Sequence, residues 1–223
     1  MQKSLLMQAL LKFFAGVILL ACLLFIPCGS FHFWPAWLLM LVLFVPMLVA
    51  GIIMWLKSPE LLQKRLDAKE KEQEQRFVVK MSGLLFVLAF VLAGLNWRFQ
   101  WILLPSWIIW MSAAVFLLSY ALYAEVLREN AYLSRTIKVQ DNQKVIDSGL
   151  YAVVRHPMYA ASILMFLSMP LILGSLFSFV LMLAYLPLIN IRMKNEEKVL
   201  ESGLDGYADY KKKVKYRVFP FIW

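Results

Sequence analysis

The chain has 223 residues, of which 62% are hydrophobic and only 17% are charged, and its mean hydropathy is +0.70. A soluble domain has roughly 45–50% apolar and about 25% charged residues, so this composition argues against an ordinary soluble protein and indicates an integral membrane protein. The net charge of +9 comes from basic residues beside apolar runs, which is typical of membrane topology signals and gives no reason to expect nucleic acid as a partner.

Six apolar segments predict six transmembrane helices in a single all-α domain, 1–223, without a dividing linker. The four N-terminal spans, within 1–126, are each about the 20 residues that a hydrocarbon core requires. We read the first as a retained helix rather than a cleaved signal. The last two spans are shorter and form a tight hairpin. The predicted spans are about Leu5–Cys28, Phe33–Leu56, Phe77–Trp97, Leu103–Val126, Met158–Leu173 and Leu176–Ile191.

Three polar segments complete the predicted fold. Residues 58–76 are rich in Glu, Lys and Gln after Pro59 and predict a short solvated helix. Residues 127–148 predict an interfacial connector. Residues 149–223 form the predicted catalytic core, which ends in a cytosolic helical segment. The chain contains no Gly-rich dinucleotide or phosphate loop, so no Rossmann domain is expected, and Cys22 and Cys28 lack metal-ligand spacing.

The basic residues are distributed very unevenly between the two sides of the predicted spans. With six spans, nearly all of the Lys and Arg residues fall on one side and Arg98 falls on the other. The positive-inside rule therefore predicts that both termini and the long polar loops are cytoplasmic, in a bacterial inner membrane or the endoplasmic reticulum.

An Arg-His-Pro sequence stands immediately before the fifth apolar segment. Pro157 fits the first turn of a helix, and the positive end of a helix dipole favours anions. Arg155 and His156 would thus be presented at a helix start, where a carboxylate ligand is plausible. The alternative is a surface Arg-His pair that touches lipid phosphate.

A second polar cluster follows the last apolar segment. Arg192 and Glu196 are spaced i,i+4 and share a helix face, whereas Glu197 points about 100° away. The alternative interpretation is a solvated salt bridge. Tyr207 and Tyr210 could stack on a flat ring or simply cover an apolar surface. Because the hairpin returns the chain to its starting side, we expect the two polar clusters to meet in space.

Together these motifs resemble a known family of membrane enzymes. The ordered stretches GLYAVVRHPMYAAS, IRMKNEEKVL, GYADYKKKV and FPF, within residues 147–221, are similar to the C-terminal core of isoprenylcysteine carboxyl methyltransferases, which is shared with membrane phospholipid N-methyltransferases. The resemblance implies an S-adenosylmethionine pocket that faces the cytosol. The cofactor-binding residues that it implies are Tyr151, His156, Pro157, Tyr159, Glu196, Glu197, Tyr207 and Tyr210, with Arg155, Arg192 and Glu196 at the reacting centre.

The expected function is therefore transfer of a methyl group from S-adenosylmethionine to a membrane-borne, lipid-like or prenylated acceptor. A carboxylate acceptor, the one most like the isoprenylcysteine family, needs no general base, whereas an amine or thiol needs His156 or a Glu to take its proton. Two alternatives remain at the sequence level. One is a sterol-reductase-like enzyme that uses reduced nicotinamide, and the other is a non-enzymatic membrane protein.

Overall fold

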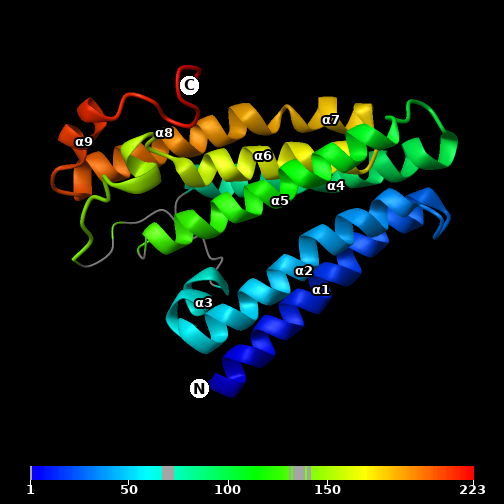
Figure 1. Ribbon diagram of the computed structural model, residues 1–223, viewed down its shortest axis with the longest axis horizontal. Coiled ribbons are helices and arrows are strands. Elements are labelled where there is room, and N and C mark those ends of the chain that lie inside the picture. Colours follow the sequence, from blue (N-terminus) through cyan, green and yellow to red (C-terminus); the bar gives the residue numbers. More distant parts are fainter. Residues whose placement is uncertain (1, 67–72, 131, 133–138, 140–141) are drawn as a thin grey trace.

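The computed structural model in Figure 1 describes residues 2–66, 73–130, 132, 139 and 142–223. Within these ranges the regular elements are all helices, and the β-type pairing is one isolated bridge between Leu103 and Ser175. The predicted all-α fold without a Rossmann domain is confirmed. The helices are α1 (Gln2–Cys28), α2 (Trp34–Lys57), α3 (Pro59–Leu66), α4 (Gln73–Phe99), α5 (Ser106–Glu129), the 3₁₀ helix η1 (Gly149–Ala152), α6 (Pro157–Ile172), α7 (Leu176–Met182), α8 (Tyr185–Gly203) and α9 (Tyr207–Lys213).

Five helical segments of the described chain are long and apolar enough to cross a membrane. Four of them correspond to the predicted N-terminal spans. The fifth, Leu176–Gly203, combines α7 and α8. Helix α6 has 16 residues, so it rises only about 24 Å, which is less than the roughly 30 Å of a hydrocarbon core. The six apolar segments thus become five long helices and one short one.

The predicted hairpin between the last two apolar segments is confirmed. Gly174 adopts φ +68° directly after α6, and Ser175 caps α7 by accepting the Ser178 N–H at 3.3 Å. The last apolar segment is predicted to end at about Ile191, with Arg192 and Glu196 on one helix face beyond it. Helix α8 continues to Gly203, because the residues from 192 to 202 are mostly good helix formers and no glycine or proline interrupts them before Gly203.

The polar elements gather at one end of the molecule. In Figure 1, α3, η1, α9 and both termini lie toward the left, whereas the α1–α2, α4–α5 and α6–α7 turns lie at the right. The predicted 58–76 helix is seen as α3, and residues 67–72 lie outside the described part. The connector 127–148 is also described only in part, because residues 131, 133–138 and 140–141 lie outside it.

Two apolar clusters hold the helices together. The first joins α1, α2, α4, α5 and α6 and includes Leu24, Phe33 and Phe116, each fully buried. At Gly94 a side-chain carbon would stand 2.7 Å from the Leu24 carbonyl oxygen, so glycine allows α4 to lie directly against the backbone of α1. The second cluster joins α4, α6, α7 and α8 with Val218 of the C-terminal segment.

Candidate functional site

The start of α6 is fixed by the C-terminal segment of the chain. Pro157 occupies the first turn of α6 and His156 is its N-cap residue. The backbone N–H groups of Arg155 and His156 donate to the carbonyls of Tyr216 and Arg217 at 3.0 and 2.8 Å. These two bonds fix the Arg-His pair against the C-terminal segment. His156 has φ −128° and ψ 61°, which lies outside the extended region expected for a residue before a proline.

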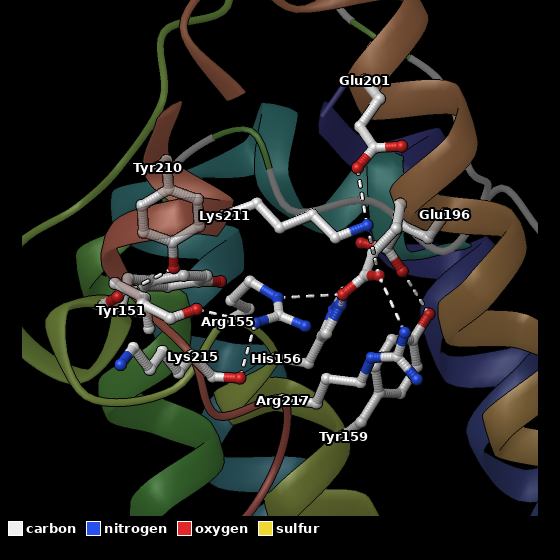
Figure 2. A network of polar contacts seen from close by, with 12 residues as sticks. Tyr151, Arg155, His156, Tyr159, Glu196, Glu201, Tyr210, Lys211, Lys215 and Arg217 are labelled. Carbon is white, nitrogen blue, oxygen red and sulfur yellow. Dashed lines mark hydrogen bonds and ion pairs between the residues drawn. The ribbon is translucent and has the colours of Figure 1, made fainter. Parts of the chain in front are cut away.

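Glu197 is the centre of a buried ion-pair network, and Figure 2 labels its partners Arg155, His156, Lys211 and Arg217. Its Oε1 accepts from Arg155 Nε at 2.9 Å and from His156 Nε2 at 3.2 Å. Its Oε2 lies 3.2 Å from Lys211 Nζ and 3.3 Å from Arg217 Nη2. The Glu197 side chain is only 3% exposed. One carboxylate therefore joins α8 to the start of α6, to α9 and to the C-terminal segment.

Arg155 is held by several contacts within the protein. Besides Glu197, its guanidinium donates from Nη1 to the carbonyls of Val214 and Lys215 at 2.6 and 2.8 Å. The Arg155 residue is 7% exposed. Its contacts thus bind the C-terminal segment against α6, which the sequence alone does not indicate.

Glu196 belongs to a separate set of contacts. Its carboxylate accepts a short hydrogen bond from the Tyr159 hydroxyl, and the same hydroxyl accepts from Arg192 Nε at 3.2 Å. The structure therefore places Arg192, Tyr159 and Glu196 in one chain of hydrogen bonds.

Helical geometry separates the two adjacent glutamates. Successive residues on an α-helix point about 100° apart, and residues three or four apart share a face. One face of α8 lines a cavity with Tyr185, Ile189, Arg192, Glu196 and Leu200. Glu197 lies on another face and points toward Arg155 and His156, so it does not line that cavity.

Three tyrosines form the wall nearest the C-terminal segment. The Tyr210 hydroxyl donates to the Tyr151 carbonyl at 2.8 Å, and Asn130 Nδ2 donates to the Tyr151 hydroxyl at 2.9 Å. Burial raises the pKa of Tyr151 to about 12 and also raises the pKa values of Tyr207 and Tyr210. These phenols therefore stay neutral at physiological pH and can donate hydrogen bonds.

The Tyr207 hydroxyl is buried and has no hydrogen-bond partner within the described residues. A buried polar atom without a partner is uncommon and calls for an explanation. Tyr207 lines the same cavity as Glu196 and His156. A ligand in this cavity is one source of the missing hydrogen bond.

The cavity has a volume of about 960 Å³ and combines a polar end with apolar walls. Arg155, His156, Tyr159, Arg192 and Glu196 lie at the polar end. The remaining wall is largely apolar and comes from α1, α2, α4, α5 and α6, with Phe13, Leu43, Met47, Val78, Phe86 and Met165 among its residues. The size is within the range of small-molecule sites, which is about 300–1,000 Å³.

The predicted meeting of the two polar clusters is confirmed, since His156 contacts Glu197 and Tyr159 contacts Glu196. Pro157 is buried at the start of α6 and does not line the cavity. Sequence reasoning missed Lys211 and Arg217, which look like ordinary members of a basic C-terminal run. It also missed Asn130, whose bond to Tyr151 depends on where the connector leaves α5.

The fold and the site define a helical membrane protein with a buried polar pocket that opens into an apolar chamber. The sequence profile of the phospholipid methyltransferase family matches residues 107–204, which extend from the start of α5 to just after α8. This match confirms the resemblance to membrane methyltransferases and covers both polar clusters. No curated protein gives a significant match to the chain.

Proposed function

We propose that the chain transfers a methyl group from S-adenosylmethionine to a lipid-like acceptor held in the membrane. The observation that carries this proposal is the cavity of about 960 Å³, which joins the polar cluster of α6 and α8 to apolar walls made by the long helices. A charged cofactor suits the polar end, and an acyl or prenyl chain suits the apolar walls. The family match supports the methyltransferase class.

The residues at the polar end fit the chemistry of the cofactor. Its methionine end carries an ammonium group, for which the Glu196 carboxylate is a charge-assisted partner. The unpartnered Tyr207 hydroxyl can donate to the cofactor, and the rings of Tyr207 and Tyr210 offer flat surfaces to its adenine. When bound, the cofactor supplies an electrophilic methyl group on a sulfonium. Catalysis by the protein then rests mainly on orientation and on exclusion of water.

The two arginines receive different proposed roles. Arg155 is held by Glu197 and by two carbonyl oxygens, so we assign it to closing the C-terminal segment over the site. Arg192 lines the cavity from α8 and contacts the Tyr159 hydroxyl. We assign Arg192 to orienting the acceptor, which would reach the site from the bilayer through the apolar part of the cavity.

The direct test is calorimetric titration of the purified protein in detergent with S-adenosylmethionine, S-adenosylhomocysteine and NADPH. We expect S-adenosylmethionine and S-adenosylhomocysteine to bind with comparable affinity, and we expect NADPH not to bind. Binding of NADPH alone would support a reductase instead. Absence of binding by all three ligands to folded protein would reject the proposed cofactor.

A further inference from the structure

His156 is a buried imidazole with one nitrogen committed to a carboxylate. The residue is 4% exposed and lines the cavity. Its Nε2 lies 3.2 Å from Glu197 Oε1. An ionised carboxylate can only accept hydrogen bonds, so Nε2 carries the proton in this contact. In the neutral ring, Nδ1 then keeps its lone pair.

The second ring nitrogen is not used by the surrounding protein. His156 is the N-cap residue of α6, yet its side chain makes no capping hydrogen bond. Across the described part of the chain, Nδ1 has no hydrogen-bond partner and is not among the fully enclosed polar atoms. A proton acceptor is therefore available at the polar end of the cavity.

Glu197, the carboxylate that faces the ring, is shared with three cations. Glu197 faces Nε2 from α8, but Arg155, Lys211 and Arg217 also contact its oxygens, at 2.9, 3.2 and 3.3 Å. The remaining neighbours are Glu196 on α8 and the Tyr159 ring, whose centroid is 5.5 Å from that of His156.

We infer that His156 is a catalytic residue whose Nδ1 takes the proton of the acceptor's nucleophile, and that Glu197 is the positioning residue that fixes the tautomer. This inference rests on the proposed function. The acceptor's lone pair forms the new bond to the methyl carbon. The carbon–sulfur bond breaks, its electron pair stays on sulfur, and the acceptor's proton moves to Nδ1. General-base catalysis of this kind typically contributes 100-fold or more to a rate.

The consequence concerns the acceptor. A carboxylate nucleophile has no proton to lose and would leave His156 without a chemical role. An amine must lose a proton during methylation, and histidine is the side chain that ordinarily exchanges protons near neutral pH. The geometry thus points to an acceptor whose nucleophile carries a proton, such as a lipid amine.

The tautomer can be tested without any turnover. The chain has two histidines, so the protein labelled with ¹⁵N-histidine gives two imidazole systems, and His32→Gln identifies the remaining one as His156. His32 lies at the opposite end of the molecule beside Ser30. We expect the neutral His156 ring to be protonated on Nε2 and not on Nδ1. A ring protonated on Nδ1 would overturn the inference.

The catalytic role is tested with two probes, a short-chain phosphatidylethanolamine as the amine and S-farnesyl-N-acetylcysteine as the carboxylate. We expect wild-type protein and His32→Gln to methylate the amine, with a rate that rises with pH. In His156→Gln the rate at saturating S-adenosylmethionine should fall by roughly 100-fold or more, while a cooperative thermal unfolding transition in detergent shows that the variant is folded.

The pH dependence of the methylation rate in Glu197→Gln is a second test. Removing the carboxylate destabilises the His156 imidazolium and should move this pH dependence to lower pH. Methylation of the carboxylate probe alone or of neither probe, or an unchanged rate in His156→Gln, contradicts the role of His156. Failure of wild-type protein to bind the cofactor would instead reject the proposed function.

Discussion

At the scale of single residues, the adjacent glutamates of α8 have different environments and therefore different expected roles. Glu196 lines the cavity, whereas Glu197 is buried among Arg155, His156, Lys211 and Arg217. The resemblance assigns both carboxylates to the cofactor. The structure favours Glu196 for that contact and makes Glu197 part of the framework that shapes the pocket.

Replacing Glu196 should weaken cofactor binding. If the Glu196 carboxylate holds the ammonium group, Glu196→Gln loses a charged hydrogen bond, which is worth about 1.5–3 kcal/mol or roughly 10- to 150-fold in dissociation constant. Calorimetry with S-adenosylmethionine measures the change. Glu201→Gln is the matched control, because Glu201 lies on the same helix but pairs with Lys211 outside the cavity. Equal affinities for the two variants would remove Glu196 from the site.

Replacing Glu197 should instead reduce stability. Glu197→Ala leaves the buried Arg155 without its carboxylate partner, and removal of one member of a buried ion pair costs about 3–5 kcal/mol. We expect a clear fall in the thermal unfolding temperature in detergent, together with weaker cofactor binding. Glu201→Ala, which breaks only an exposed pair, should change the unfolding temperature little. A variant at Glu197 as stable as the wild type would show that the network is not structural.

Arg192 should separate binding from chemistry. In Arg192→Ala we expect cofactor affinity to change by no more than about threefold, whereas methyl transfer falls by roughly 100-fold because the acceptor is no longer oriented. Arg192→Lys should restore little if Arg192 holds the acceptor through two N–H groups, since an ammonium cannot replace a planar guanidinium. The measurement is the transfer rate at saturating cofactor. A wild-type rate in Arg192→Ala would show that Arg192 does not orient the acceptor and only contacts Tyr159.

At the scale of elements, local sequence rules located the two polar clusters of the site. They did not predict that α9 and the C-terminal segment pack against these clusters. Pro157 marked the helix start and Gly174 the hairpin turn, because both depend on local backbone preferences. The partners of Glu197 in α9 and the C-terminal segment could not be predicted, since they depend on the path of the chain after Gly203. Hydropathy marks only where the last helix leaves the apolar layer. The spacing of Arg192 and Glu196 indicated that the helix continues, but its end at Gly203 is seen only in the structure.

The junction between α5 and η1 offers a test of local geometry. Gly149 has φ +57°, and a side-chain carbon there would stand 2.0 Å from Glu129 Oε1. That carboxylate accepts the Leu150 N–H at 2.9 Å. Gly149→Ala combines a left-handed conformation, which costs about 1–2 kcal/mol, with loss of this contact. We expect a lower unfolding temperature and displacement of Tyr151.

Gly51→Ala is the control for that substitution, because nothing lies within 4 Å of the added carbon in the middle of α2. Alanine is favoured over glycine inside a helix, so the unfolding temperature of Gly51→Ala should be unchanged or slightly higher. If Gly149→Ala were as stable as Gly51→Ala, the Glu129 contact would not fix the start of the catalytic core.

At the scale of the whole molecule, the cavity joins two parts of the chain that differ in what the sequence reveals. The polar end lies within residues 107–204, which match the family. Much of the apolar wall comes from α1, α2 and α4, which lie outside that match. Hydropathy cannot separate residues that face lipid from residues that face a cavity, because both are apolar. The sequence therefore predicts the spans without predicting the chamber.

The same arrangement predicts the orientation in the membrane. Both termini, α3 and α9 lie at the end that holds most basic residues, and Arg98 lies beside Gly29 at the opposite end. The positive-inside rule predicts that the first end is cytoplasmic, where the proposed cofactor would reach the polar site from solution. In a variant whose Cys22 and Cys28 are replaced, a membrane-impermeant maleimide should label Ser30→Cys in intact cells. Ser202→Cys, at the exposed end of α8, should react only after the membrane is opened. Labelling of Ser202→Cys in intact cells would reverse the orientation and place the polar site on the side away from the cytoplasm.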